Sequence, residues 1–488
     1  MKSQSRYLGD LMGNKRQLSR KYFLYYIITM VCSIIYAGIF LIIAIRLLFS
    51  DFFLFDIYLI PVCIGAIRIL VALIPRVNHK QEDDLIFSEN CFIENTKKIA
   101  TSMQSLYPKS IYVIYDANAC AFSYKGEEVI ALGFPLTILM NKSELSFVIG
   151  HELAHHFYGD VRYGKNMKKV ESTFMKLMIT LNNPYLFVLA WPYRFIAKIL
   201  FKEIKKLSRQ AEYNADRHSA NIIGKQPTIS ALKKIAISRY SWHLYLSLWI
   251  RILSEYQIYV DIVENYRLFI TTLDIDTNSL EFSREPAGEY DSHPTLYERI
   301  MEVENKCTDD TDGIEIDEYH IDSIKLSKHF WNRYTCGKFE DLNSPIIKDS
   351  KKAMEELAIK MASEYKDIFE SYTYADASAI MTMYPQVSYN LYQKTHEDEF
   401  EFEVDMITRI LCAIIYLKIK PENWRIGPSF TPELIVEDQV IDLYSIIIDS
   451  FNFKSANFNE MLKTLNIDGH DLISELSLTE HDYGTLFV

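Results

Sequence analysis

A long apolar segment near the amino terminus dominates the hydrophobic pattern. Residues 23–45 contain no charged side chain, and as an α-helix they would extend about 35 Å, enough to cross a bilayer core of roughly 30 Å. Residues 57–74 form a second apolar run that holds one charge, Arg68, near enough to one end to reach the interface. We therefore expect an amino-terminal hairpin of two transmembrane helices.

A cleaved signal peptide is the competing interpretation of the first run. That run is too long for a signal peptide, no small-residue cleavage site follows it, and a second apolar run comes next.

The charges that flank the two spans predict their orientation in the membrane. Basic residues precede the first span and follow the second, namely Lys2, Arg6, Lys15, Arg16, Arg20, Lys21, Arg76 and Lys80. Because basic flanks stay in the cytosol, we expect both ends of the hairpin and the rest of the chain there.

The segments after the hairpin favour a mainly α-helical fold with one small β-sheet. Residues 88–106 have helical periodicity, and residues 111–115 are rich in β-branched and aromatic side chains. Residues 118–124 and 128–132 flank a short connection, which predicts a β-hairpin. From Pro135 onward, helix dominates the pattern. Helical patterns recur after residue 305, at 351–370, 397–418 and 432–450, so the carboxy-terminal part is expected to be entirely α-helical.

Composition supports a helix-rich, folded protein. The 488 residues include only 16 Gly and 14 Pro, while 49% are hydrophobic, so low-complexity and small disulfide-stabilised proteins are excluded. The seven cysteines are scattered and form no CxxC pair, which indicates free thiols in a reducing compartment.

Charge divides the chain near residue 306. Residues 1–305 carry 35 basic and 30 acidic side chains, whereas residues 306–488 carry 17 and 34. The acidic balance argues against a nucleic-acid-binding protein, because the chain has no excess of basic side chains to neutralise the phosphates. We predict three segments: a membrane anchor (1–76), a central domain (77–305) and an acidic helical domain (306–488).

The segment NKSELSFVIGHELAHHFYGD, residues 141–160, carries the clearest chemistry. Asn141 and Glu144 form a predicted capping box, and the whole segment is expected to be one helix. His151 and His155 lie four residues apart and would project from one face of that helix, with Glu152 beside them. Two imidazoles plus a carboxylate suit zinc. The alternative is a pair of solvated or core histidines without a metal.

A second segment, SRQAEYNADRHSANIIG at residues 208–224, offers the third ligand. Glu212 and Asp216 would share one helix face, and Gly224 is a helix stop signal. Glu212 could bind zinc while Asp216 holds a ligating imidazole by a hydrogen bond. The alternative is a solvated acidic pair beside Arg209 and Arg217.

Five blocks in order resemble a known family, the gluzincin membrane metallopeptidases of the HtpX-like and CAAX prenyl-protease type. The resemblance covers roughly residues 20–305. It rests on the membrane hairpin, NACAF at 118–122, HELAH at 151–155, SRQAEYNAD at 208–216 and SHPTLYERI at 292–300. It implies an α+β zincin-like peptidase domain, and it favours the inner membrane of a bacterium.

The resemblance implies that His151, His155 and Glu212 bind one zinc ion per chain and that Glu152 is the general base. It also implies that Asp216 supports a ligand and that His293 and Arg299 reach into the site. Glu152 would accept a proton from the attacking water, and His293 would donate a hydrogen bond to the oxyanion. His293 could instead be an ordinary histidine before a proline, and Arg299 a structural ion-pair partner.

In the family, the strand that matches NACAF is a sheet edge that holds substrate by backbone pairing. This assigns substrate binding to Asn118, Ala119, Cys120, Ala121 and Phe122. The alternative is a simple core strand. Cys120 is better interpreted as a small apolar residue than as a nucleophile, because no partner base is evident nearby.

The sequence departs from the HtpX-like pattern in two places. Residues 184–193 give only about ten apolar positions, too few to span a bilayer, so residues 176–201 are expected to lie on the membrane surface or over the active site. Residues 306–488 have no recognised counterpart. Their acidic stretch at 308–318 is a predicted linker, and the acidic cluster at 397–405 is a solvated helix face or a site for a basic protein partner.

We therefore expect a multi-pass membrane zinc endopeptidase that cleaves membrane or cytosolic polypeptides on the cytosolic side. Its partners would be the polypeptide substrate and the lipid bilayer, with no nucleic acid. Two alternatives stay open. One is a zinc-domain scaffold that recruits a partner through the acidic helical domain, and the other is a prenyl-protein protease.

Overall fold

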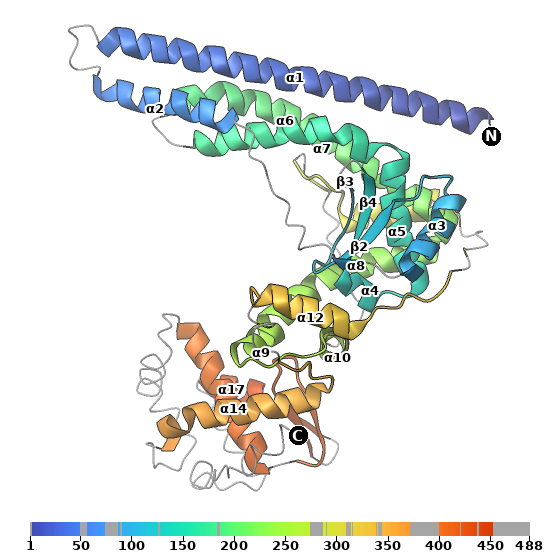
Figure 1. The fold of residues 1–488 in the computed structure, drawn as a ribbon, viewed down its shortest axis with the longest axis vertical. Coiled ribbons are helices and arrows are strands. Elements are labelled where there is room, and N and C mark those ends of the chain that lie inside the picture. Colours follow the sequence, from blue (N-terminus) through green and yellow to red (C-terminus); the bar gives the residue numbers. More distant parts are fainter. Residues whose placement is uncertain are drawn as a thin grey trace. The chain divides into compact units, whose positions relative to one another are not determined.

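Figure 1 shows the computed structural model of the chain as a ribbon. The structure describes residues 2–48, 56–73, 86–87, 90–124, 127–182, 186–273, 286–288, 290–308, 314, 316–337, 339, 344–370, 400–419, 421–436 and 439–451.

The chain divides into two compact units. The first contains Met1–Arg239 and Thr277–His320, and the second contains Tyr240–Asp276 and Ile321–Val488. Residues 240–276, which fall in the predicted central segment, thus group with the carboxy-terminal residues.

The first unit begins with two apolar helices, α1 (Lys2–Leu48) and α2 (Asp56–Leu73), which pack against each other. Within α1, Arg16–Ile43 has a mean hydropathy of 2.4 with only 11% of its apolar window buried. This stretch is long and apolar enough to cross a membrane. The described apolar part of α2, Cys63–Leu73, is shorter, so the second predicted span stays a prediction.

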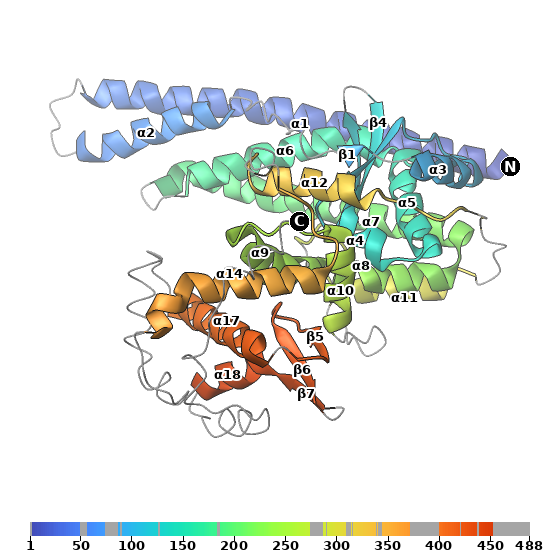
Figure 2. The same ribbon diagram turned by 60° about the horizontal axis from the view of Figure 1, so that its bottom comes forward.

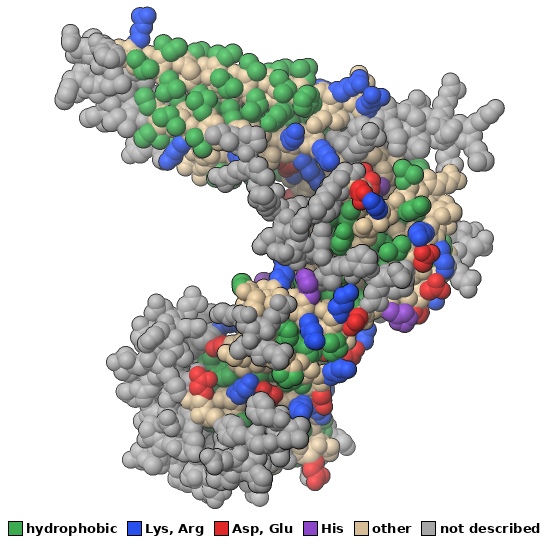
Figure 3. Space-filling view, viewed as in Figure 1, with side chains coloured by type: hydrophobic (Ala, Val, Ile, Leu, Met, Phe, Trp, Pro, Cys, Tyr) green, Lys and Arg blue, Asp and Glu red, His purple; other side chains and the backbone are tan. Residues whose placement is uncertain are grey.

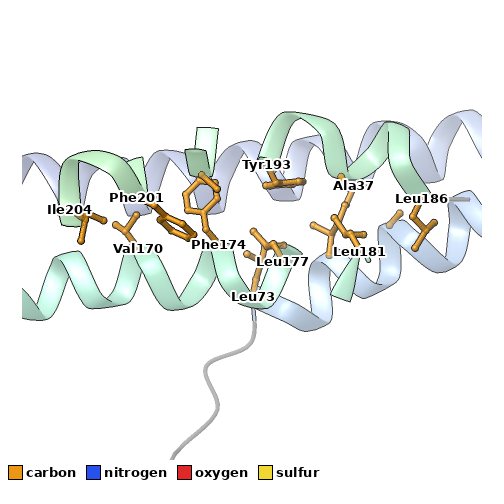
Figure 4. Close-up of a cluster of buried hydrophobic side chains, with 14 of the residues drawn as sticks. Ala37, Leu73, Val170, Phe174, Leu177, Leu181, Leu186, Tyr193, Phe201 and Ile204 are labelled. Carbon is orange, nitrogen blue, oxygen red and sulfur yellow. The ribbon is translucent and has the colours of Figure 1, made fainter. Parts of the chain in front are cut away.

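Helices α6 (Asp160–Thr180) and α7 (Phe187–Ile223) run alongside α1 and α2. Apolar side chains from all four helices meet in one buried cluster, in which Ala37, Leu73, Phe174 and Tyr193 represent one helix each (Figure 4). Residues 176–201 were expected on the membrane surface or over the active site. Their described part packs apolar side chains against the amino-terminal helices, and their contact with a membrane stays a prediction.

A four-stranded sheet forms the next layer, in the order β1-β2-β4-β3. Its strands are β1 (Ile86–Phe87), β2 (Ser110–Ile114), β3 (Ala119–Tyr124) and β4 (Glu127–Gly133). β3 and β4 form the predicted antiparallel hairpin, with Ala121 opposite Ile130, and β2 pairs with β4 in parallel. Helices α3 (Asn90–Ser102) and α4 (Phe134–Leu139) flank the sheet. The order leaves β3 at one edge.

Helix α5 (Lys142–Phe157) begins at the predicted capping box. The Asn141 side chain accepts a hydrogen bond from the Glu144 backbone N–H at 3.0 Å, and the Glu144 carboxylate accepts one from the Asn141 N–H at 2.8 Å. The prediction of one helix as far as Asp160 was wrong. Gly159 adopts a left-handed conformation with φ of 72°, so α5 ends and Asp160 begins α6.

Helices α5 and α7 cross at a glycine. A Cβ atom on Gly150 would lie 2.4 Å from the Ser219 hydroxyl oxygen of α7. That hydroxyl donates a hydrogen bond to the Phe147 carbonyl of α5 at 3.0 Å. Only glycine therefore permits this approach of the two helices. The remaining helices of the first unit are α11 (Leu296–Lys306) and most of α8 (Lys225–Tyr245).

The second unit is built around aromatic side chains. Trp249 packs on Phe269 and on Phe430, with ring centroids 5.0 and 4.7 Å apart, and its indole N–H donates to the Pro428 carbonyl. The elements are η4 (Leu246–Ile250), α9 (Arg251–Glu255), α10 (Ile262–Thr272), α12 (Ser323–Tyr334), α14 (Ser350–Glu370), α17 (Phe400–Ile419), β5 (Trp424–Ile426), β6 (Pro432–Val436), β7 (Gln439–Asp442) and α18 (Leu443–Phe451).

The expectation of an all-α carboxy-terminal domain was wrong. β5, β6 and β7 form an antiparallel three-stranded sheet beside α17 and α18 (Figure 2). The predicted helix at 432–450 is instead two paired strands followed by a short helix, because the β-branched residues of PELIV and QVID pair before the chain turns helical. Parts of the acidic stretches at 308–318 and 397–405 lie outside the described residues.

The α5–α7 crossing gives a first prediction. Gly150→Ala should lower the thermal unfolding midpoint of the detergent-solubilised protein, because overpacking reduces the free energy of unfolding by about 1–3 kcal/mol. Gly164→Ala in α6 is the matched control, because no atom lies within 4 Å of its added Cβ. Adding Ser219→Ala should restore much of the loss, since the Ser219 Cβ would be 3.4 Å from the new methyl group. Equal midpoints for both glycine variants would show that the contact is not tight.

Candidate active site

Two imidazoles of helix α5 face each other in the first unit. The Nε2 atoms of His151 and His155 lie 3.1 Å apart, and the rings are nearly perpendicular, with an interplanar angle of 87°. Their spacing of four residues places both on one side of α5, as the sequence predicted. His151 is buried and His155 is partly buried.

Helix α7 brings a carboxylate to the same point. Glu212 Oε2 lies 3.4 Å from His151 Nε2, and Glu212 Oε1 lies 3.7 Å from His155 Nε2. One donor atom from each of the three residues lies within 4.8 Å of the others, so the group could hold a metal ion.

The far nitrogen of each imidazole lies beside a carboxylate. His151 Nδ1 is 2.9 Å from Asp216 Oδ1, and His155 Nδ1 is 3.3 Å from Asp160 Oδ2. These carboxylates favour a proton on each Nδ1. Both Nε2 atoms then face one another and Glu212, an arrangement that one cation, taking the place of any Nε2 proton, would satisfy. The donor set of two nitrogens and one oxygen fits zinc.

Arg299, from helix α11, anchors the acidic pair of α7. Its Nε and Nη2 atoms donate to the two Asp216 carboxylate oxygens at 2.8 and 2.6 Å, and Nη1 lies 3.8 Å from Glu212 Oε2. Such a two-point pair holds the carboxylate plane in one orientation. Arg299 therefore orients His151 through Asp216.

The charges in this cluster shift one another's protonation. Burial raises the pKa of Glu212, but the hydrogen bonds of His151 and His293 outweigh it and leave that pKa well below its usual value. Burial also raises the pKa of Asp216, and Arg299 reverses the shift, so its pKa is lowered. For His151, burial lowers the pKa, but Asp216 and Glu212 raise it to about 10. Both carboxylates are therefore ionised at neutral pH, as metal binding requires.

Glu152 is not one of the three donors that converge in the site. It is only 6% exposed and lines a cavity of about 960 Å³ together with His151, His155 and Glu212. Among the described residues, none forms a hydrogen bond or an ion pair with its carboxylate. A buried carboxylate that borders the cavity beside the three donors has the chemistry of a proton acceptor.

Residues 90–306 match the sequence model of peptidase family M48. This part of the chain is therefore similar to the peptidase domain of that family. The matched residues include helix α5 with both histidines, helix α7 with Glu212, and Arg299.

Curated relatives carry the same family resemblance at low identity. The chain is 31% identical over 150 residues to Protease HtpX of Wigglesworthia glossinidia brevipalpis, a match that covers 26% of the chain and 51% of that protein. It is 25% and 26% identical to the Protease HtpX homologs of Bacillus velezensis and Bacillus pumilus, with 47% of the chain and 75% of each relative covered. The first match thus spans about half the relative's length. No solved structure matches the chain.

His293 lies at the rim of the site formed by His151, His155 and Glu212. Its Nδ1 atom is 3.2 Å from Glu212 Oε1, while 66% of its side chain is exposed. It precedes α11, which starts at a capping box of Thr295 and Glu298. Arg209 of α7 donates to the Gly288 and Asp291 carbonyls at 3.0 and 2.7 Å, so it ties the segment before His293 to α7.

The predicted substrate strand borders the same cavity. Asn118, Ala119, Cys120, Ala121 and Phe122 all line it. β3 is an edge strand among the described residues of the sheet, so one row of its backbone groups has no strand partner there. Cys120 is exposed and lines the cavity together with its strand neighbours.

Sequence reasoning missed three supporting residues. Asp160 was assigned to the end of α5, although it starts α6 and lies beside His155. Arg209 was considered only as a partner of acidic neighbours. His156 places its Nδ1 atom 2.6 Å from Glu128 Oε2 on β4 and so connects the histidine helix to the hairpin of β3. The glycine stop at Gly159 was the signal that could have relocated Asp160.

The position of Asp160 gives a second prediction. Asp160→Asn should weaken metal binding by roughly 10–100-fold, because the amide no longer favours a proton on His155 Nδ1. Competition with a chelator of known affinity measures this change. Glu264→Gln is the control, since Glu264 pairs with Arg267 on α10 of the second unit. Unchanged affinity in Asp160→Asn would rule out a role for this carboxylate in orienting the ligand.

Proposed function

We propose that the chain is a membrane-anchored zinc endopeptidase. The observation that carries this proposal is the convergence of His151, His155 and Glu212 on one point, with Glu152 beside them at a large cavity. A complete set of three donors and a nearby carboxylate matches the requirements of metal-assisted peptide hydrolysis.

His151, His155 and Glu212 would hold the zinc ion. Bound there, zinc supplies Lewis acidity that polarises a water molecule and the peptide carbonyl. Asp216 and Asp160 keep the two imidazoles in the orientation that directs Nε2 inward. Arg299 fixes Asp216 and compensates the buried negative charge.

Glu152 would accept the proton of the attacking water and return it to the leaving amine. His293, which lies at the rim of the cavity with 66% of its side chain exposed, would donate a hydrogen bond to the developing oxyanion. The edge of β3 would hold the polypeptide extended by backbone pairing, which favours unfolded or loosely folded substrates over rigid domains.

The apolar surface supports the membrane anchor. Side chains on the outer faces of α1, α2, α6 and α7 are exposed and hydrophobic, as the continuous apolar face in Figure 3 illustrates. Examples are Ile34 on α1, Ile67 on α2, Ile179 on α6 and Ile199 on α7. A water-soluble protein rarely exposes such a large apolar face. We propose two spans with the catalytic unit in the cytosol, on the basis of the flanking positive charges.

The central test of the activity is Glu152→Gln in the full chain. This variant should keep stoichiometric zinc, because the donors are untouched, and should lose cleavage of an unfolded test protein by at least about 100-fold. His151→Ala is the matched control and should lose both zinc and cleavage. Cleavage that survives in Glu152→Gln would contradict the mechanism. Intact cellular function in this variant would favour the scaffold alternative.

Single-cysteine variants test the orientation. Cys336 is exposed in the second unit, and Cys32 lies on α1 within the apolar segment. A membrane-impermeant maleimide should label Cys336 in inverted vesicles but not in intact cells, whereas Cys32 should react only after detergent is added. Labelling of Cys336 from outside intact cells would place the second unit on the wrong side for this proposal.

A further inference from the structure

Basic side chains of three helices, here called the belt, gather at one end of the apolar face of the first unit. The belt is defined by Arg16, Arg20 and Lys21 on α1, Lys165, Lys168 and Lys169 on α6, and Lys202, Lys205 and Lys206 on α7. Blue side chains gather at that end of the apolar face in Figure 3. The exposed apolar surface begins just beyond the belt, at Phe23 on α1 and Met175 on α6.

Contacts between the helices show that the basic residues share one level. Asn166 of α6 donates to the Ser19 hydroxyl of α1 at 2.9 Å, and the Lys169 ammonium lies 5.9 Å from the Tyr26 ring centroid. Lys205 of α7 pairs with Glu171 of α6. Segments 16–21, 165–171 and 202–206 therefore lie side by side. They carry the nine basic residues of the belt and two acidic ones, Glu171 and Glu203.

We propose that this belt binds the headgroups of anionic phospholipids. In a bilayer, the phosphates lie immediately outside the hydrocarbon layer, and basic side chains at that depth attract them. The belt lies immediately outside the apolar face, so its depth matches the headgroups if that face lies in hydrocarbon. The excess of basic over acidic residues then selects anionic over zwitterionic lipid. The inference rests on the proposed membrane anchor.

The belt also borders the catalytic cavity. Lys165, Lys168 and Lys205 line the cavity, together with Leu18 of α1 and Ile204 of α7. Glu212 follows Ile204 by eight residues on the same helix, which is about 12 Å along the axis. Headgroups bound to the belt would thus form one rim of the cavity, and the metal site would lie about 12 Å along α7 from the level of the belt.

Lipid selectivity of the full chain tests the proposal. The protein is reconstituted in mixed phosphatidylcholine and phosphatidylglycerol vesicles, and spin-labelled forms of each lipid report the fraction held at the protein surface. We expect phosphatidylglycerol to be preferred on the order of fivefold or more, the effect of about one basic side chain near an anionic surface. Equal retention of the two lipids would overturn the proposal.

Two triple variants separate the belt from general charge. Lys165→Gln, Lys168→Gln and Lys169→Gln together should bring the preference close to one. Lys325→Gln, Lys328→Gln and Lys352→Gln remove the same charge from exposed helix positions of the second unit and should leave it unchanged. Equal loss in both triple variants, or retention in the first, would contradict a site at the belt. Displacement of the lipid preference by inorganic phosphate at constant ionic strength would also contradict it, because the site would then be one for free anions.

Flotation of the vesicles keeps this inference distinct from the proposed function. Protein that fails to float with any vesicle would contradict the membrane anchor itself. Protein that floats, binds zinc and cleaves through Glu152, but retains both lipids equally, would overturn the lipid site alone.

Discussion

The close crossing of helices α5 and α7 is the contact on which the metal site depends. The two histidines lie on α5 and both acidic residues lie on α7, so neither helix carries a site alone. The missing side chain at Gly150 lets the helices approach until the Ser219 hydroxyl bonds to the α5 backbone. Glu212 and Asp216, one turn apart, then reach the two nitrogens of His151 from the facing helix.

Arg299 completes this arrangement from a third helix. A pair of buried carboxylates four residues apart would repel each other, and burial disfavours their charged forms. The guanidinium group donates two hydrogen bonds to Asp216 and lies near Glu212, so it offsets both costs. The same helix α7 that carries these acids continues into the apolar cluster with α1, α2 and α6. Helix α7 therefore runs as one helix from the apolar cluster to the metal site.

The sequence predicted the local features whose causes lie within a few residues. The capping box of Asn141 and Glu144, the four-residue spacing of His151 and His155, and the β3–β4 hairpin all follow from short-range geometry. The meeting of His151 with Glu212 was expected only through the family resemblance, because spacing along one helix says nothing about which helix faces it. The roles assigned to these residues stay predictions until the variants are measured.

The differences arose where tertiary packing decides. Asp160 was misplaced because a single left-handed glycine ends α5 and turns the next residue back toward His155. The run at 432–450 contains helix-compatible residues, yet its β-branched positions pair in a sheet. The apolar run at 184–193 is too short to span a bilayer, and the sequence alone did not show that α1 and α2 offer an apolar surface for α6 and α7.

X-ray absorption spectroscopy at the zinc edge of the metal-loaded full chain tests the central claim most directly. The account predicts one zinc ion with nitrogen and oxygen ligands only, including two imidazoles at about 2.0–2.1 Å. Removal of either His151 or Glu212 should change this spectrum. A sulfur ligand at about 2.3 Å, or a site without imidazole, would contradict the metal centre described for α5 and α7.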